Sequence, residues 1–507
     1  MLLTFECPMR LTAEQLIVKL SQEVNIQLIS KQPCCKTYYD SFDWRLYSNA
    51  ISCELRSRSL TLTSLKSGLV IAEAAQKKTP SLSTSLEPGT LRDTLAPLLE
   101  MRALLPVCQL DYHIYQLAIF NEDQKIILRL QFEAYGQLKS RILLQPVKGY
   151  DKAVEQVTEF LLTTLGLTVT DKSILPAALQ VQGRKPKDYS SKLNINLAPD
   201  MRADIASKYI YSHLLKAIKT NEPGTIANTD SEFLHDFRVA VRRTRAGLSQ
   251  IKHILPDQLN SYYAGFFSWL GQITGPTRDL DVYLLSFERY KNSLPESIKE
   301  DLNPLYDFLL TKQQKAQQEL AKNLQSSRYL KTLAEWEQYL KEPSYKNSLE
   351  KNVLRTIKEV ADQRIWKTFT CVLKEGKTIN DSSPAESLHD LRKSCKKLRY
   401  LMEFFQSLYP EEQIKQLIKN LKGLQEVLGD FQDYAIQEHN LKLYSEEMID
   451  LKIPVNTFLA VGVLIQNLDA HRCQARIDYA SKFEAFKQPE NRSAFKLLFA
   501  PVQPNPN

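Results

Sequence analysis

Two stretches of the sequence each place one histidine and three cations along a single stripe of a predicted α-helix. An α-helix turns by about 100° per residue, so residues three or four positions apart lie on the same face. The members of the two stripes are His235, Arg238, Arg242 and Arg245, and His389, Arg392, Lys396 and Arg399. Three further cations border the stripes, namely Arg243, Lys393 and Lys397. Guanidinium and ammonium groups donate charge-assisted hydrogen bonds to phosphate and carboxylate oxygens, so the pattern indicates anion binding.

These cations have few acidic neighbours in the sequence. Asp236 is the only acid in residues 234–253, and Asp390 is the only acid in residues 388–402. The alternative interpretation is a solvated helix face, but such a face normally places acids four residues from its bases. Because an unpaired row of like charges repels itself, we expect an extended anion to complete it. The nearby acids are expected to orient the arginine side chains or to cap helices; they are Asp236, Asp279, Asp390 and Asp433.

The two stretches are copies of one repeated unit. Equivalent residues are 154 positions apart (389 − 235 for the two histidines), and the same offset relates the Gly-x-x-x-Asp sequences at 275–279 and 429–433. Each copy begins with Ser/Thr-x-x-Glu, at Thr229 and at Ser383, which predicts a capping box, and Pro384 would occupy the first helical position. The opposite side of each helix is expected to face a core. Its apolar residues are Phe237, Val241, Leu248, Leu391, Cys395, Leu398 and Met402.

The motif Leu-His-Asp-x-Arg-x-x-x-Arg/Lys-Arg/Lys-x-Arg resembles a CHAD domain, an α-helical module named for its histidines. The resemblance continues into Gly275–Val282 and Leu424–Asp430 and covers about residues 200–487, although the family more often has a small or apolar residue where Pro276 stands. It implies an all-α domain of two pseudo-symmetric helical bundles that binds inorganic polyphosphate along a basic groove. The predicted polyphosphate-binding residues are His235, Arg238, Arg242, Arg243, Arg245, His389, Arg392, Lys393, Lys396, Lys397 and Arg399.

The first 170 residues have a different pattern. Residues 51–58 and 126–133 alternate apolar and polar side chains, which is typical of half-buried strands. Helices are predicted at residues 13–23, 91–101 and 151–165. Many strands with a few helices favour an α+β domain built on a curved antiparallel sheet or barrel.

The segment Tyr38–Leu46, which runs into Glu54–Arg58, is similar to the second and third strands of a CYTH domain, the triphosphate-tunnel fold. That family's chemistry needs a Glu-x-Glu-x-Lys first strand and later carboxylates, which hold divalent metal ions against phosphates. The first strand here, Thr4–Pro8, has one glutamate, and the later strand Arg141–Pro146 has none. We therefore expect a degenerate CYTH-like domain with no catalytic residues and no metal site.

The alternative for this domain is a metal-dependent triphosphatase or cyclase that uses Glu6, Glu54 and Glu133. Three arginines on the same strands could hold an anion, but inward salt bridges with Glu54 and Glu133 are the favoured interpretation. These arginines are Arg56, Arg58 and Arg129.

Composition favours an intracellular globular protein. The 507 residues are 43% hydrophobic and 24% charged, enough for two cores, and the net charge of +8 makes the basic stripes local features. The eight cysteines show no C-x-x-C spacing, which favours reduced thiols over a zinc site or a disulfide scaffold. Residues 455–468 are apolar but interrupted by polar residues, so we expect a buried helix and no membrane insertion. The expected location is the cytoplasm, with polyphosphate granules suggested by the predicted ligand.

The chain is predicted to divide into several parts, with a linker marked by Pro176, Gly183 and Pro186 and by a lack of periodicity. The parts are a CYTH-like domain at 1–170, the linker at 171–198, the all-α domain at 199–487 with halves at about 200–345 and 346–487, and a C-terminal tail at 488–507. Helices of the all-α domain, besides those carrying the stripes, are predicted at 202–219, 258–272, 280–290, 302–324, 329–340, 349–373, 411–428 and 432–447.

The predicted function is non-catalytic binding of inorganic polyphosphate, without a cofactor. Sites for single-stranded nucleic acid pair cations with aromatic stacking platforms, and the stripes carry none, since Phe237 lies on the core side. Duplex nucleic-acid binding is a second alternative, although the sequence shows no recognition-helix signature. No Walker loop, Rossmann fingerprint or His/Cys metal box is present, and the residues predict no particular oligomeric state.

Overall fold

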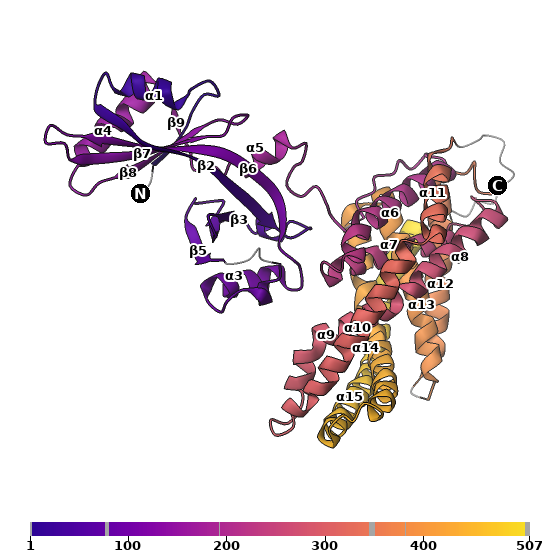
Figure 1. The fold of residues 1–507 in the computed structure, drawn as a ribbon. Coiled ribbons are helices and arrows are strands. Elements are labelled where there is room, and N and C mark those ends of the chain that lie inside the picture. The colour runs from indigo at the N-terminus through magenta and orange to yellow at the C-terminus, as the bar shows by residue number, and fades with distance from the viewer. Residues whose placement is uncertain (1–2, 77–80, 192, 344–349, 381, 502–507) are drawn as a thin grey trace. The chain divides into compact units, whose positions relative to one another are not determined.

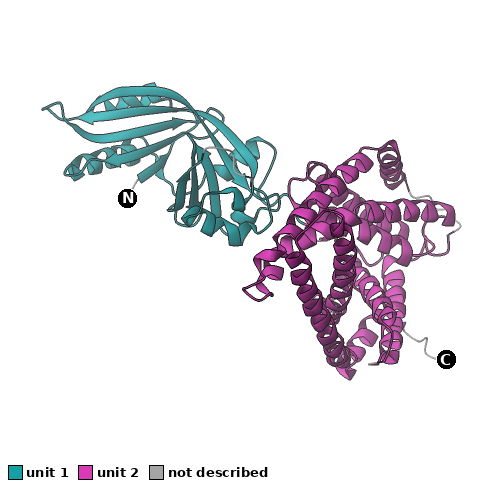
Figure 2. Ribbon diagram, turned by 60° about the horizontal axis from the view of Figure 1, so that its bottom comes forward, with its two compact units in different colours: residues 1–190 teal, residues 191–507 magenta. Residues whose placement is uncertain are grey.

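The structure is a computed structural model and describes residues 3–76, 81–191, 193–343, 350–380 and 382–501. The chain forms two compact units, unit 1 at Met1–Ser190 and unit 2 at Ser191–Asn507 (Figure 2). Unit 1 is an antiparallel sheet with a few helices, and unit 2 is helical (Figure 1). The predicted order of an α+β part followed by an all-α part is therefore confirmed.

Unit 1 is built on one antiparallel sheet whose described strands follow the order β5-β4-β3-β2-β6-β7-β8-β1-β9. The alternation of β7 places Leu128, Leu130 and Phe132 in a core that α1 and α4 cover, and it turns the polar residues to the other face. The strands are β1 Leu3–Glu6, β2 Asn25–Asp40, β3 Ile51–Arg56, β4 Ser59–Ser64, β5 Val70–Ala75, β6 Leu105–Phe120, β7 Ile126–Ala134, β8 Arg141–Pro146 and β9 Thr168–Val169. The helices are α1 Ala13–Leu20, α2 Arg45–Ser48, α3 Thr90–Leu99, α4 Asp151–Glu159 and α5 Leu175–Val181.

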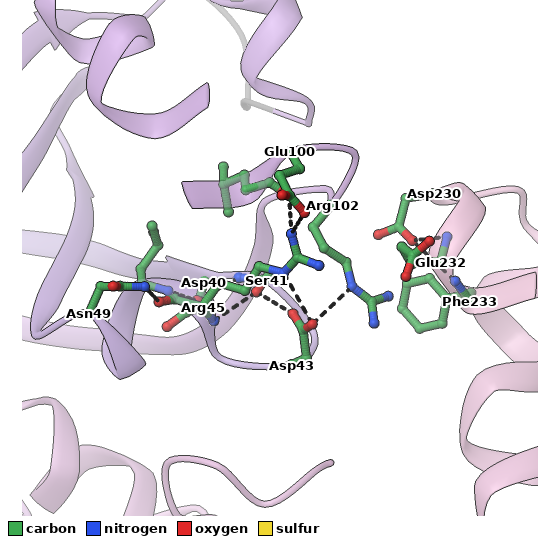
Figure 3. A network of polar contacts seen from close by, with 12 residues as sticks. Asp40, Ser41, Asp43, Arg45, Asn49, Glu100, Arg102, Asp230, Glu232 and Phe233 are labelled. Carbon is green, nitrogen blue, oxygen red and sulfur yellow. Dashed lines mark hydrogen bonds and ion pairs between the residues drawn. The ribbon is translucent and has the colours of Figure 1, made fainter. Parts of the chain in front are cut away.

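Two aspartates hold the turn that follows β2 (Figure 3). The carboxylate of Asp40 accepts hydrogen bonds from three backbone N–H groups, one from Ser41 and two from α2. The carboxylate of Asp43 accepts from Ser41 Oγ at 2.7 Å and from Arg45 Nε at 3.2 Å, and it lies 3.3 Å from Arg102 Nε. Both acids of the segment that resembles a CYTH strand thus act on the local backbone and its neighbours.

Helix α5 lies inside the interval 171–198, which was expected to be a linker. Leu175, Ala178 and Leu179 are buried in a cluster that includes Val107 and other side chains of β6. Pro176 occupies the first turn of this helix, where a proline without an N–H group is tolerated. The proline is thus a helix start and not a break.

Unit 2 repeats its helices at the spacing found in the sequence. Helices α6, α7 and α8 begin at Ala203, Ser231 and Asp257, and α12, α13 and α14 begin 154 positions later in each case. The helices are α6 Ala203–Ile226, α7 Ser231–Gln250, α8 Asp257–Ile273, α9 Gly275–Asn292, α10 Asn303–Leu324, α11 Ser327–Lys341, α12 Ile357–Thr378, α13 Ala385–Phe405, α14 Glu411–Ile449, α15 Val455–Phe486 and α16 Pro489–Phe499. The repeated unit therefore covers the packing of whole helices and not only the basic motif.

Helix α14 is continuous through Gly429, so the prediction of two separate helices at 411–428 and 432–447 is wrong. In the first half the corresponding stretch is divided into α8 and α9, which meet at Thr274. Pro276 follows at once and cannot donate the backbone hydrogen bond that a continuous helix would need. Proline thus separates in one half what remains joined in the other.

Two hydrogen bonds between the halves are exchanged by the repeat. Ala203 N donates to Arg355 O at 2.9 Å, and Ile357 N donates to Met201 O at 2.8 Å. Each donor and acceptor of the first bond is 154 positions before or after the corresponding atom of the second. Reciprocal contacts of this kind define an isologous relation. The two halves are therefore related by a pseudo-two-fold axis.

The helix starts differ from the predicted capping boxes. Asp230, and not Thr229, is the N-cap of α7, and its carboxylate accepts from the N–H groups of Glu232 and Phe233 (Figure 3). Helix α13 has Pro384 as its N-cap, with no side-chain cap. Aspartate is a stronger N-cap than threonine, which explains the shift in the first copy.

Both ends of the C-terminal region are helical. The tail expected at 488–507 contains α16, whose Phe495 stacks on Phe369 of α12 with ring centroids 3.8 Å apart. The apolar residues 455–468 lie in α15, where Val461 and Leu464 are buried. Among the described helices, none is both long and apolar enough to span a lipid bilayer.

Candidate anion-binding site

Helices α7 and α13 pack against each other and carry the two predicted stripes. Their apolar sides enter the core of unit 2 as expected, since Phe237, Val241, Leu391 and Leu398 are fully buried. The helical spacing that buries these residues leaves the cations on the remaining faces. The stripes are therefore fixed by the same packing that holds the two halves together.

A cavity of about 270 Å³ opens between four helices of the repeat. Its wall contains four arginines, two aspartates and several neutral side chains, and Tyr283 Oη donates to Gln437 O at 3.1 Å across equivalent positions of the two halves. The lining residues are His235, Arg238 and Arg242 of α7, Arg278, Asp279, Val282 and Tyr283 of α9, Arg392 of α13, and Asp433, Ile436, Gln437 and Asn440 of α14.

Arg242 and Lys396 occupy equivalent positions on α7 and α13. Burial, followed by the positive charges of Arg392 and Arg242, lowers the pKa of Lys396 to about 8. Within the described residues, no carboxylate oxygen lies within 4.0 Å of either Arg242 or Lys396. Cations from both halves thus converge here without acidic partners.

Arg238 is held by polar groups at the junction of α8 and α9. Its Nη1 donates to Thr274 Oγ1 at 2.7 Å and to Gly271 O at 3.2 Å. Burial and the positive charge of Arg242 lower its pKa to about 10. A Cβ added at Gly275 would lie 3.8 Å from Nη1, so the repeated glycine adjoins the repeated arginine.

The second copy positions Arg392 in the same way. Its Nη2 donates to Asp433 Oδ1 at 3.1 Å, and a Cβ at Gly429 would lie 4.0 Å from its Nε. His389 Nδ1 lies 2.7 Å from Gln432 Oε1 on the same helix, α14. Asp433 therefore orients an arginine, which is the role expected for the acids of the motif.

Glu403 is a partner that the sequence reasoning missed. Its Oε2 accepts from Arg243 Nη2 at 2.9 Å, and its Oε1 lies 3.3 Å from Arg399 Nε. Asp390 likewise lies 2.6 Å from Lys393. The expectation that the cations lack acidic partners is therefore wrong for four of them, namely Arg243, Arg392, Lys393 and Arg399. The signal was present, because Glu403 follows Arg399 by four residues, one position beyond the window counted.

Arg278 is a second omission. It lines the cavity, with its side chain 17% exposed and its Nη1 3.9 Å from Glu232 Oε1. It lies in the conspicuous sequence after Gly275, but its position in the repeat corresponds to Gln432, so the search for paired cations passed over it.

The cavity gathers some of the predicted residues and leaves others outside. His235, Arg238, Arg242 and Arg392 line it. The remaining predicted residues are not in its wall; they are Arg243, Arg245, His389, Lys393, Lys396, Lys397 and Arg399. Of these, Arg245, Lys393 and Lys397 are exposed on the outer part of α7 and α13.

The carboxylates suggested for metal binding in unit 1 have separate cationic partners. Glu6 lies 2.6 Å from Lys139 Nζ, and Glu54 lies 3.8 Å from Lys36 Nζ. Glu133 lies 3.9 Å from Arg56, as expected, and it also accepts from Gln131 and Tyr135. Over the described ranges, no group of three His, Cys, Asp or Glu side chains is arranged to hold a metal ion. The residues present do not fit the two-metal chemistry of a triphosphate tunnel.

Comparison with known families places the cavity in one recognised region. Residues 210–442 match the model of the CHAD domain, and this range contains every residue that lines the cavity. Two uncharacterized proteins of Mycobacterium tuberculosis, from different strains, are each 25% identical over 256 residues, which are 48% of this chain and 47% of the relative. The chain spans about half the length of these curated relatives.

Solved structures give weaker likenesses. The CHAD domain from the plant Ricinus communis has 24% identity and a TM-score of 0.48, covering 61% of this chain and 97% of that chain. PptA from Streptomyces chartreusis has 16% identity and a TM-score of 0.43, covering 57% and 100%. A Hippeastrum protein described as revealing a dominant triphosphatase activity has 13% identity and a TM-score of 0.24, covering 37% and 99%.

Proposed function

Residues 210–442 form a CHAD domain, and on that premise we propose that this domain binds inorganic polyphosphate without catalysis, in a basic groove along α7 and α13. The observation that carries the proposal is the convergence of Arg242 and Lys396, equivalent cations without a carboxylate within 4.0 Å in the described structure. A charge that is half-buried beside other like charges is unfavourable until an anion joins it. Phosphate oxygens supply that anion.

The symmetry of the site favours a chain without direction. A linear polyphosphate reads the same from both ends, so it matches two half-sites related by a pseudo-two-fold axis. A single nucleic-acid strand has a direction and binds through stacked bases. The aromatic side chain in the cavity wall, Tyr283, is buried and donates its hydroxyl hydrogen bond to the backbone of α14. The wall therefore offers phosphate contacts in preference to base stacking.

The two aspartates in the wall are compatible with this role. Asp433 holds Arg392 at 3.1 Å. Burial raises the pKa of Asp279, while the charges of Arg238 and Arg278 oppose that shift. Each acid is thus engaged with arginines, and its charge is partly neutralised before a ligand arrives. The arginines remain oriented toward a phosphate chain that passes between them.

The test is binding of long-chain polyphosphate to the full protein by titration calorimetry at about 0.15 M salt. The double variant R242E/K396E should lose binding, because each substitution replaces a phosphate partner by a repelling charge, while the helical circular dichroism signal is kept. The control variant K331E/K341E makes the same change of charge on α11, where both lysines are highly exposed. Equal affinity of R242E/K396E and the wild type would contradict the proposed function.

A competition experiment separates polyphosphate from duplex DNA. A cavity of about 270 Å³ between helices is too small to admit a duplex, so DNA at equal phosphate concentration should displace little polyphosphate. Full displacement by DNA would favour a nucleic-acid surface instead.

A further inference from the structure

The two ends of the α7–α13 pair differ in charge although the halves are repeats. At one end, Arg243 of α7 and Arg399 of α13 share the carboxylate of Glu403. We propose, resting on the function proposed above, that Glu403 closes this end of the groove to phosphate. A bound chain then ends at Glu403 and continues into solvent past Arg245 and Lys397, at the opposite end.

The closed end is held by an ion pair with little exposure. Arg243 Nη2 donates to Glu403 Oε2 at 2.9 Å, and the two side chains are 14% and 15% exposed. Arg399 Nε lies 3.3 Å from Glu403 Oε1, and Arg243 Nη1 also donates to Ser191 O at 3.3 Å. Ion pairs removed from solvent are weakly screened by salt. A phosphate must therefore displace a carboxylate before it reaches either arginine.

The open end has the same positions but no acid. Moving the closed end by the repeat distance of 154 gives Lys397, Arg245 and Ser249 in place of Arg243, Arg399 and Glu403. Ser249 is exposed, and its hydroxyl donates to Ala246 O at 3.0 Å. In the part of the chain that the structure describes, no carboxylate oxygen lies within 4.0 Å of Arg245 or Lys397, and both side chains are exposed. Two cations are thus available at this end and engaged at the other.

Side-chain bulk differs between the ends in the same sense. A Cβ added at Gly271 of α8 would lie 2.9 Å from Arg245 Nη1, so the glycine leaves room for that guanidinium. The equivalent position in α14 is Gln425, which is 7% exposed. Within the described ranges neither atom of its amide has a hydrogen-bond partner. A buried side chain therefore occupies, in the half of Arg399, the space that stays open beside Arg245.

These differences define the ligand as the end segment of a linear polyanion and make Glu403 the residue that limits the bound length. Removing the charge of Glu403 releases two cations to phosphate, and placing a charge at Ser249 engages two. Each phosphate contact contributes about 0.7 to the slope of log affinity against log salt for a single-stranded polyanion. The salt slope therefore counts the contacts at each end.

The experiment measures this slope for long-chain polyphosphate and four full-length proteins. E403Q keeps the shape and hydrogen-bonding oxygen of Glu403 and should steepen the slope by about 1.4, from two added contacts. S249E should form the i,i+4 pair with Arg245 that Glu403 forms with Arg399 and should flatten the slope by between about 0.7 and 1.4. E337Q is the matched control, because Glu337 also contacts two lysines, Lys219 and Lys341, away from the groove. Its slope should equal that of the wild type.

Slopes of E403Q and S249E that both equal the wild-type slope would overturn the proposal while leaving polyphosphate binding itself intact. The same holds if E403Q flattens the slope. Absence of binding by the wild-type protein would overturn the proposed function and the closed end together. Because S249E is a surface substitution, the result does not depend on whether E403Q folds.

Discussion

Arg242 of α7 and Lys396 of α13 stand at equivalent positions of the two halves, and the positive charge of Arg242 helps to lower the pKa of Lys396 to about 8. Burial is the largest cause of this shift, and Arg392 adds to it. The repeat thus brings like charges together at the junction of the halves. Their repulsion is the physical basis of the predicted affinity for a polyanion and of its predicted dependence on pH.

Polyphosphate affinity should fall as the pH rises above 8. Bound phosphate raises the pKa of Lys396 above its free value of about 8, so the bound protein keeps a proton that the free protein loses. The extra affinity is fully present below pH 8 and is lost as the pH rises through the bound value, by up to about tenfold per pH unit. Titrations at pH 7, 8, 9 and 10 measure it. K396R stays charged over this range and should lose the dependence; an unchanged pH profile in K396R would assign the effect to another group.

Replacing Lys396 by methionine should stabilise the free protein. The folded pKa lies below the reference value of 10.5, so the unfolded chain binds more protons between pH 8 and 10.5, and stability rises with pH in that window. At pH 7, K396M should raise the free energy of unfolding by about 1–3 kcal/mol, since an unfavourable charge is removed. Urea unfolding at pH 7 and pH 10 checks this, and the gain should shrink at pH 10. A K396M protein less stable than the wild type at pH 7 would show that the lysine is well accommodated.

Unit 1 should release no phosphate from tripolyphosphate in the presence of Mg²⁺ or Mn²⁺. Its three candidate carboxylates, Glu6, Glu54 and Glu133, contact different cations, and hydrolysis through two metals needs them on shared ions. A phosphate-release assay on the full protein measures this directly. Metal-dependent release that disappears in E133Q would restore a catalytic role for the sheet.

Two glycines of unit 2 should respond oppositely to alanine. A Cβ at Gly376 would lie 2.1 Å from the ring of buried Phe483, so G376A should destabilise the protein by about 1–3 kcal/mol. Gly423, inside α14, has no atom within 4 Å of an added Cβ, and G423A should stabilise by up to about 1 kcal/mol through helix propensity. Denaturant midpoints of the two variants measure the difference. Equal midpoints would show that the helices can shift to admit the methyl group.

The helices that carry the stripes could be predicted because one periodicity decides two things at once. The spacing that aligns Arg238 with Arg242 also places Phe237 and Val241 on the opposite side, and both are fully buried. The repeat distance then predicted the second copy, and the structure extends it to the starts of three pairs of helices. Local pattern and tertiary packing agree in this part of the chain.

The partners of the cations could not be predicted in the same way. Asp433 reaches Arg392 from another helix, and Glu403 reaches across to Arg243, so both ion pairs depend on how helices pack. The continuity of α14 was missed because Gly429 is a weak helix former, although here it lies beside the guanidinium of Arg392. Pro176 was interpreted as a break for a similar reason, since proline both ends and begins helices.

A crystal structure of the full protein with a bound polyphosphate chain tests the central claim most directly. The predicted result is a chain with phosphate oxygens within hydrogen-bond distance of both Arg242 and Lys396. A chain bound elsewhere, with Arg242 and Lys396 contacting no phosphate, would contradict the proposed site.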